Sequence, residues 1–219
     1  MPLTKIKSLG ITDGTIALAD LSATGTKDAT TYLRGDNSFA VVSSDYVLLA
    51  TTTVSSAVAS VSFDGYFSST YQNYIVHFSN IIPATTNQLF KTRYRRSNAD
   101  VTTNNYKYAG YGHRVNSASS DSVDTTYGWN NPETVINPLP VWNSSAYGIT
   151  GQIIVFNPLG TSNYKYSNYN SSVHYDSNIW NSTGGSFSLS DATTALSGIS
   201  FYFNSGNIST GNFKLYGLK

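Results

Sequence analysis

The chain has 219 residues, but only 13 are basic and 12 acidic, which gives a formal net charge of +1. Such a chain lacks the basic stripe of a nucleic-acid-binding protein and has no apolar run long enough for a membrane-spanning helix. We therefore expect no nucleic-acid partner and no insertion into a membrane. Ser, Thr and Asn together make up 78 residues, so hydroxyls and amides must form most of the surface.

Residues 1–45 differ from the rest of the chain because they carry small apolar groups separated by Gly, Thr, Asp and Ser. A segment this thin cannot bury enough surface by itself to offset the entropy lost on ordering. It is either a free tail or an extended arm that orders against copies of itself or a larger partner. Its evenly spaced apolar residues favour the arm. They are Ile6, Leu9, Ile11, Ile16, Leu18, Leu21, Leu33 and Phe39.

From residue 46 onward, short segments alternate apolar and polar side chains with the two-residue period of β-strands. Turn-forming clusters separate them, and this combination is typical of a β-sandwich or jelly roll. The sequence therefore predicts an all-β domain over 46–219. We expect long loops at 115–122 and 130–145 and a further loop or single turn at 191–196. The predicted strands lie at 59–63, 74–78, 90–94, 151–156, 199–203 and 213–215.

Several stretches resemble fibre and receptor-binding proteins on the virions of tailed bacteriophages, especially the type found in phages of aquatic and cyanobacterial hosts. The N-terminal stretches are 11–16, 20–22 and 31–39, of which TYLRGDNSF is the most distinctive. The others are 71–78, 80–85, 90–94, 151–158, 164–166, 204–208 and 211–218. The resemblance implies a virion surface protein with a β-sandwich domain, assembled as a homotrimer.

Two functions are compatible with this resemblance. The first is a short tail fibre or receptor-binding protein that recognises a host cell-surface glycan, with residues 1–45 attached to other virion proteins. The alternative is a capsid decoration protein or head fibre with a structural role, which the short chain without shaft repeats favours. In both cases the protein is located on the virion.

The sequence places many aromatic residues in segments rich in Asn, Ser and Gly, which we expect to form loops. Tyr and Trp provide stiff amphipathic area, while Ser, Gly and Asn provide adaptable hydrogen bonds. This mixture suits a glycan, which offers C–H faces for stacking and hydroxyls for hydrogen bonding. Alternatively, part of the set packs in the core or at a subunit interface. The candidates for ligand binding are Tyr106, Tyr108, Tyr111, Tyr127, Trp129 and Trp142.

The predicted strand at 90–94 continues into a cluster of basic residues. Its two-residue alternation places Lys91, Arg93 and Arg95 on one face. They form either a solvated face that protects an edge from aggregation or a contact for an anion such as phosphate or an acidic sugar.

We expect no enzyme, no cofactor and no metal site. The chain has eleven Asp and one Glu, Glu133, and the acids form no local pair except Asp121 and Asp124. A glycosidase needs two carboxyl groups that face one bond. The three His residues are too scattered in sequence for a local metal motif, and no Cys is present.

Overall fold

The computed structural model describes residues 22–42, 44–190 and 194–219, and all regular secondary structure in these residues is β-strand. The predicted all-β fold is therefore confirmed. The chain divides into two units, Met1–Ser44 and Asp45–Lys219. Most of the evenly spaced apolar residues of the predicted arm, and the first part of the predicted turn at 191–196, lie outside the described residues.

The strands have the following bounds. They are β1 (Thr31–Leu33), β2 (Phe39–Val41), β3 (Tyr46–Val54), β4 (Val61–Asp64), β5 (Asn73–Pro83), β6 (Phe90–Arg96), β7 (Ala99–Asp100), β8 (Tyr106–Asn116), β9 (Ser122–Asn131), β10 (Thr134–Val135), β11 (Ile149–Phe156), β12 (Lys165–His174), β13 (Ile179–Leu189), β14 (Gly198–Phe203) and β15 (Ile208–Leu218).

The first unit contains a small antiparallel hairpin made of β1 and β2. At its turn, Asn37 adopts a left-handed conformation with φ of 61°, which Asn tolerates better than most residues. The Asp36 carboxylate accepts a hydrogen bond from the Ser38 amide at 3.1 Å. Ala23 is the only buried residue among 22–42, so this described part has almost no core of its own.

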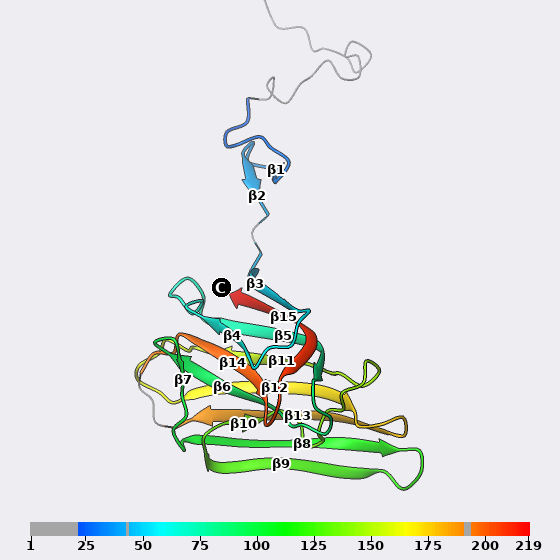
Figure 1. Cartoon of the computed structure of the whole chain (residues 1–219). Coiled ribbons are helices and arrows are strands. Elements are labelled where there is room, and N and C mark those ends of the chain that lie inside the picture. Colours follow the sequence, from blue (N-terminus) through cyan, green and yellow to red (C-terminus); the bar gives the residue numbers. More distant parts are fainter. Residues whose placement is uncertain (1–21, 43, 191–193) are drawn as a thin grey trace, which may run out of the picture. The chain divides into compact units, whose positions relative to one another are not determined.

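The second unit is a β-sandwich, as predicted. Its larger sheet has eight antiparallel strands in the order β3-β15-β5-β11-β12-β13-β8-β9. Its smaller sheet has the order β10-β6-β14-β4, and β7 pairs with β6. In Figure 1 the larger sheet runs from β3 at one edge to β8 and β9 at the other.

The core between the two sheets is built around phenylalanine rings. Phe90 on β6 and Phe201 on β14 stack with their ring centroids 5.9 Å apart. From the larger sheet, Phe78 on β5 lies 5.3 Å from Phe90, and Phe213 on β15 lies 5.3 Å from Phe201. All four side chains are buried, so these rings join strands that are far apart in the sequence.

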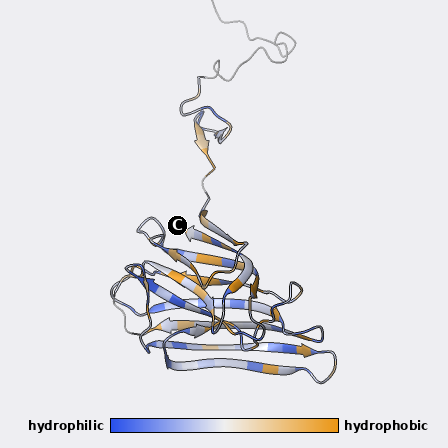
Figure 2. Ribbon diagram, in the orientation of Figure 1, coloured by the Kyte–Doolittle hydropathy of each residue, from blue (hydrophilic) through white to orange (hydrophobic). Residues whose placement is uncertain are grey.

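The expected loop at 115–122 is present but shorter than predicted. β8 extends to Asn116 and β9 begins at Ser122, so only 117–121 form the turn of a long hairpin. The expected loop at 130–145 is also interrupted, because β9 reaches Asn131 and β10 covers Thr134–Val135. Sequence alternation missed β9 because most of its residues are of intermediate hydropathy, as its pale colour in Figure 2 shows.

Replacing Phe90 by alanine should lower the free energy of unfolding by about 3–5 kcal/mol, since the change leaves a cavity among rings that cannot collapse around it. Denaturant unfolding followed by circular dichroism measures this change. Leu48→Ala is the matched control, because Leu48 is 51% exposed and its loss should cost less than about 1 kcal/mol. Equal destabilisation by the two variants would contradict the assignment of the core.

Candidate functional site

The register of the larger sheet aligns one outward-facing residue from each of five neighbouring strands. Trp129 on β9 pairs with Lys107 on β8, which pairs with Ser188 on β13. Ser188 pairs with Tyr166 on β12, which pairs with Phe156 on β11. We call these five residues the transverse row. With about 4.8 Å between neighbouring strands, the row is about 19 Å long.

These residues face away from the core because successive side chains of a strand point to opposite faces. On β12, Lys165 and Ser167 are buried, whereas Tyr166 between them is 53% exposed. On β13, Phe187 and Leu189 enter the core on either side of Ser188. Trp129 at the edge of the sheet is 73% exposed, so the row presents its rings to solvent.

A hollow of about 290 Å³ lies along the first four members of the row, and its lining includes Trp129 and Tyr166. Small residues line it between these rings, namely Ala109 on β8 and Ser186 and Ser188 on β13. The Lys107 ammonium lies over the Trp129 ring, 4.4 Å from its centroid. The hollow therefore combines an aromatic wall at each side with hydroxyl groups between them.

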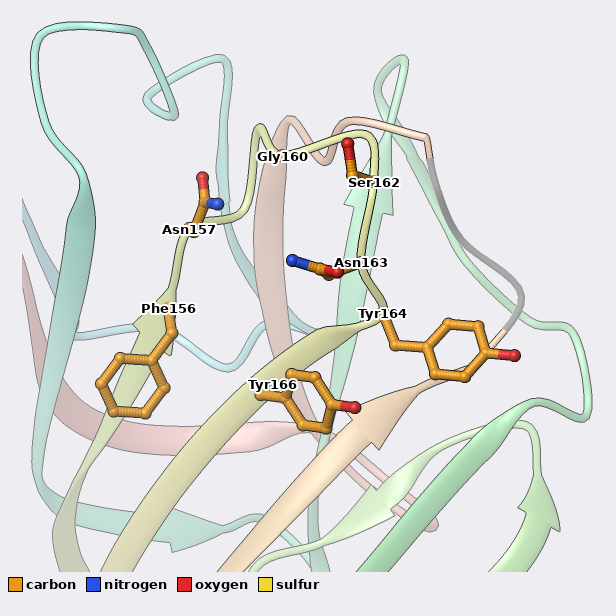
Figure 3. Close-up of a pocket in the computed structure, with 7 residues that line it drawn as sticks. All are labelled: Phe156, Asn157, Gly160, Ser162, Asn163, Tyr164 and Tyr166. Carbon is orange, nitrogen blue, oxygen red and sulfur yellow. The ribbon is translucent and has the colours of Figure 1, made fainter.

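A second hollow of about 530 Å³ lies beside the first, and Tyr166 lines both. It lies under the loop between β11 and β12. Figure 3 shows the Asn163 amide pointing into the space between Asn157 and Tyr166, while the Tyr164 ring points away from Tyr166. Its lining residues are Phe156, Asn157, Gly160, Ser162, Asn163, Tyr164 and Tyr166.

A buried lysine holds the loop over this second hollow. The Lys165 side chain is only 1% exposed, and its ammonium donates a hydrogen bond to the Gly160 carbonyl. Burial lowers the pKa of Lys165, and the charge of Arg96 lowers it further. The hydrogen bond to Gly160 ties the loop to β12 at the residue next to Tyr166.

The chemistry of the two hollows suits a ligand with both apolar faces and many hydroxyls. Exposed aromatic rings provide flat surfaces for C–H groups, and the Ser hydroxyls and Asn amides donate and accept hydrogen bonds. Binding sites for small molecules commonly combine apolar walls with a few placed polar groups. Sugar rings are the biological ligands that match this combination most directly.

Three of the six predicted aromatic contacts lie on this outer face, although on strands rather than in loops. Trp129 belongs to the transverse row. Tyr127 is 80% exposed and pairs with Ala109, whose side chain lines the first hollow. Tyr111 is 68% exposed on the same face of β8. The predicted loop location was wrong because the polar segments around these rings form the β8–β9 hairpin.

The other three do not belong to the set of rings exposed on this outer face. Tyr106 is fully buried, accepts a hydrogen bond from the Tyr94 amide at 2.8 Å, and cannot contact a ligand. Tyr108 belongs to the inner face of β8, where a Cβ added to Gly128 would lie 2.3 Å from its ring, but Tyr108 is also one of the residues that line the first hollow.

Trp142 follows β10 and is far from the transverse row. Its ring packs against Tyr147 and Tyr175, with centroids 6.5 and 5.5 Å away. Tyr175 directly follows β12, at the opposite end of this strand from Tyr166. Trp142 therefore does not share a site with Trp129.

Four of the five members of the row were absent from the predicted site, namely Lys107, Ser188, Tyr166 and Phe156. The alternation of Tyr164 and Tyr166 around Lys165 signals one exposed strand face, and this signal could have identified Tyr166. The run 151–156 instead suggests a buried strand, but its last residue, Phe156, faces outward and is 37% exposed.

The basic cluster on β6 forms an internal ion-pair network instead of an open anion contact. Glu133 accepts hydrogen bonds from Lys91 at 2.5 Å and from Arg93 at 2.7 Å. Arg95 pairs with Asp64 at 2.9 Å and with Asp100 at 2.5 Å. Three carboxylates thus balance the three predicted cations, and acidic side chains of the protein already occupy this contact.

Comparisons with protein-family models, with curated proteins and with solved structures each found no match. Among the described residues, no group of three or more His, Cys, Asp or Glu side chains could hold a metal ion. The same residues contain no helix that is long and apolar enough to cross a membrane. Function is therefore inferred from the residues and their geometry.

The ion-pair network makes stability depend on pH. Burial raises the pKa of Glu133, but hydrogen bonds from Lys91 and Tyr202 and the charges of Lys91 and Arg93 outweigh it, so this pKa lies below its ordinary value of 4.5. A carboxylate of this kind stabilises the fold above its unfolded-state pKa, and the contribution is lost as the pH falls through the folded-state pKa.

We expect Glu133→Gln to lower the free energy of unfolding by about 1–3 kcal/mol at pH 7, because Lys91 and Arg93 lose their charged partner. The variant should also lose less stability than the wild type as the pH falls below 4.5. Denaturant unfolding at several pH values measures both effects. Asp45→Asn, an exposed site outside the network, is the control. An acid profile for Glu133→Gln identical to that of the wild type would contradict this account.

Proposed function

We propose that the protein is a virion surface protein of a tailed bacteriophage, a short tail fibre or receptor-binding protein that binds a host cell-surface glycan. The transverse row is the observation that supports glycan binding most strongly, because it exposes Trp129 and Tyr166 on either side of a hydroxyl-lined hollow. The assignment to a phage virion is based on the sequence resemblance.

The position of the row on strands favours recognition of a repeating polymer. Its aromatic residues are held by a continuous hydrogen-bonded sheet, which keeps their spacing fixed before the ligand arrives. The two hollows share Tyr166, so an extended chain of sugars can follow the row from β9 to β11. Each contact is shallow, and several copies on one particle would multiply weak binding.

The N-terminal unit supports assembly with other chains. Tyr32, Leu33, Val41 and Val42 are all exposed in a region where only Ala23 is buried. A segment that leaves its apolar side chains in water gains stability when another chain covers them. We therefore propose that residues 1–45 join copies of the chain into a homotrimer and attach it to other virion proteins.

Trp129→Ala and Tyr166→Ala should each weaken binding of the full chain to host cells at least tenfold, because each removes a stacking surface. A tenfold loss corresponds to about 1.4 kcal/mol. Trp180→Ala is a matched control, since Trp180 lies on the same face of β13 as Ser188, but eight residues or about 27 Å away. Binding of fluorescently labelled protein to cells measures the effect.

Thermal unfolding must show that all three variants remain folded. Binding of Trp129→Ala and Tyr166→Ala at the wild-type level would contradict the proposed glycan site. If the wild type binds no cells but coats particles lacking the protein, the chain is instead a capsid decoration protein or head fibre, and the row has another role.

Leu33→Ser combined with Val41→Ser should shift the full chain from trimer to monomer, because the two changes remove apolar surface that the proposed assembly covers. Sedimentation velocity measures the change in mass. Val115→Ser combined with Val123→Ser replaces two equally exposed residues on the β8–β9 hairpin and should leave the trimer intact. A wild-type chain that sediments as a monomer would contradict the proposed assembly.

A further inference from the structure

Lys107 is the only charged residue among the described residues that line the two hollows. The lining otherwise consists of aromatic, hydroxyl, amide and small residues. Lys107 lies within the row, one strand from Trp129 and one strand from Ser188. A ligand that follows the row therefore passes a single positive charge.

The surroundings of Lys107 differ from those of the paired cations on this unit. Lys91, Arg93 and Arg95 all pair with carboxylates on the smaller sheet, and Arg114 pairs with Asp124 on the inner face of β8 and β9. The contact described for Lys107 is the face of the Trp129 ring. A ring orients an ammonium without supplying a negative charge, so the contact with Trp129 leaves Lys107 available to an anionic group.

The ring contact also leaves hydrogen-bond donors for a ligand. An ammonium has three N–H donors and no acceptor, and the aromatic face occupies only one side of it. The neighbouring residues along the first hollow are Ala109, Ser186 and Ser188, which are small and leave room beside the ammonium. Ser188 can add a hydroxyl donor to the same ligand group.

We infer that the glycan recognised by this face is acidic, and that Lys107 binds a carboxylate or phosphate group carried by one of its sugars. This inference rests on the proposed function. Trp129 and Tyr166, three strands or about 14 Å apart, would stack on sugars on either side of the charged group. The anion contact that the sequence suggested for β6 would thus lie on β8, where no carboxylate of the described residues forms an ion pair with Lys107.

The test compares Lys107→Gln with Lys107→Arg in the full chain. The probes are polysaccharide from the host surface, the same material after chemical reduction of its carboxyl groups, and the same material after removal of its phosphate. Biolayer interferometry measures affinity for each. The wild type should bind one of the treated samples about tenfold more weakly than the native one, and the treatment responsible identifies the anionic group.

Lys107→Gln should bind native polysaccharide as weakly as the wild type binds the polysaccharide that has lost its anionic group. The variant should also bind native and treated polysaccharide with equal affinity. Lys107→Arg should retain most of the affinity, because it keeps the charge. Binding by the wild type should weaken with added salt, since charge attraction at an exposed site is screened. Binding by Lys107→Gln should depend less on salt.

Two other results separate failure of this inference from failure of the proposed function. In one result, Trp129→Ala loses binding while Lys107→Gln binds both native and treated polysaccharide like the wild type. The proposed glycan site is then supported, but the inference that Lys107 binds an acidic group of the glycan is wrong. If Trp129→Ala and Lys107→Gln both bind native polysaccharide like the wild type, the glycan site itself is wrong, and this inference fails with it.

Discussion

The alternation of side chains along each strand is the constraint on which the larger sheet depends. Every second residue must enter the core, so the residues between them form the outer face whatever their chemistry. On β12 this rule buries Lys165 and exposes Tyr166. Because β11, β12, β13 and β8 pair in continuous register, and β9 keeps its register with β8 from the Lys107–Trp129 pair onward, their outward residues align across the sheet. The transverse row follows from this alignment and is held more rigidly than residues on loops.

The two sheets use their outer faces differently. The smaller sheet carries the ion pairs of Glu133, Asp64 and Asp100 with the basic residues of β6, which balance one another. The strands of the larger sheet that carry the row expose rings, amides and hydroxyls instead. In a chain with only 25 charged residues, one cation beside an exposed Trp ring changes the chemistry of that face considerably. This contrast separates a face that stabilises the fold from a face suited to a ligand.

Sequence alternation predicted the sandwich because strands such as β5 and β14 alternate or concentrate apolar residues clearly. Sequence alternation missed the β8–β9 hairpin because Gly, Thr and Tyr occur on both of its faces. The buried and the exposed face therefore differ little in hydropathy. The same period could have separated Tyr106 from Tyr111, since an odd spacing of five places them on opposite faces. The transverse row could not be predicted from the sequence, because it depends on β8 pairing with β13 across more than 70 residues of the chain. The ion pairs of β6 with Glu133 depend in the same way on long-range pairing with β10.

We propose that a glycan binds to the outer face of the larger sheet, along the transverse row. The most direct measurement is a crystal structure of the full chain with an oligosaccharide released from the host surface. We expect sugar rings stacked on Trp129 and Tyr166, with the hollow between them filled. Sugar bound elsewhere, for example over Tyr202 on the smaller sheet or beside Trp142, with the row left empty, would contradict this proposal.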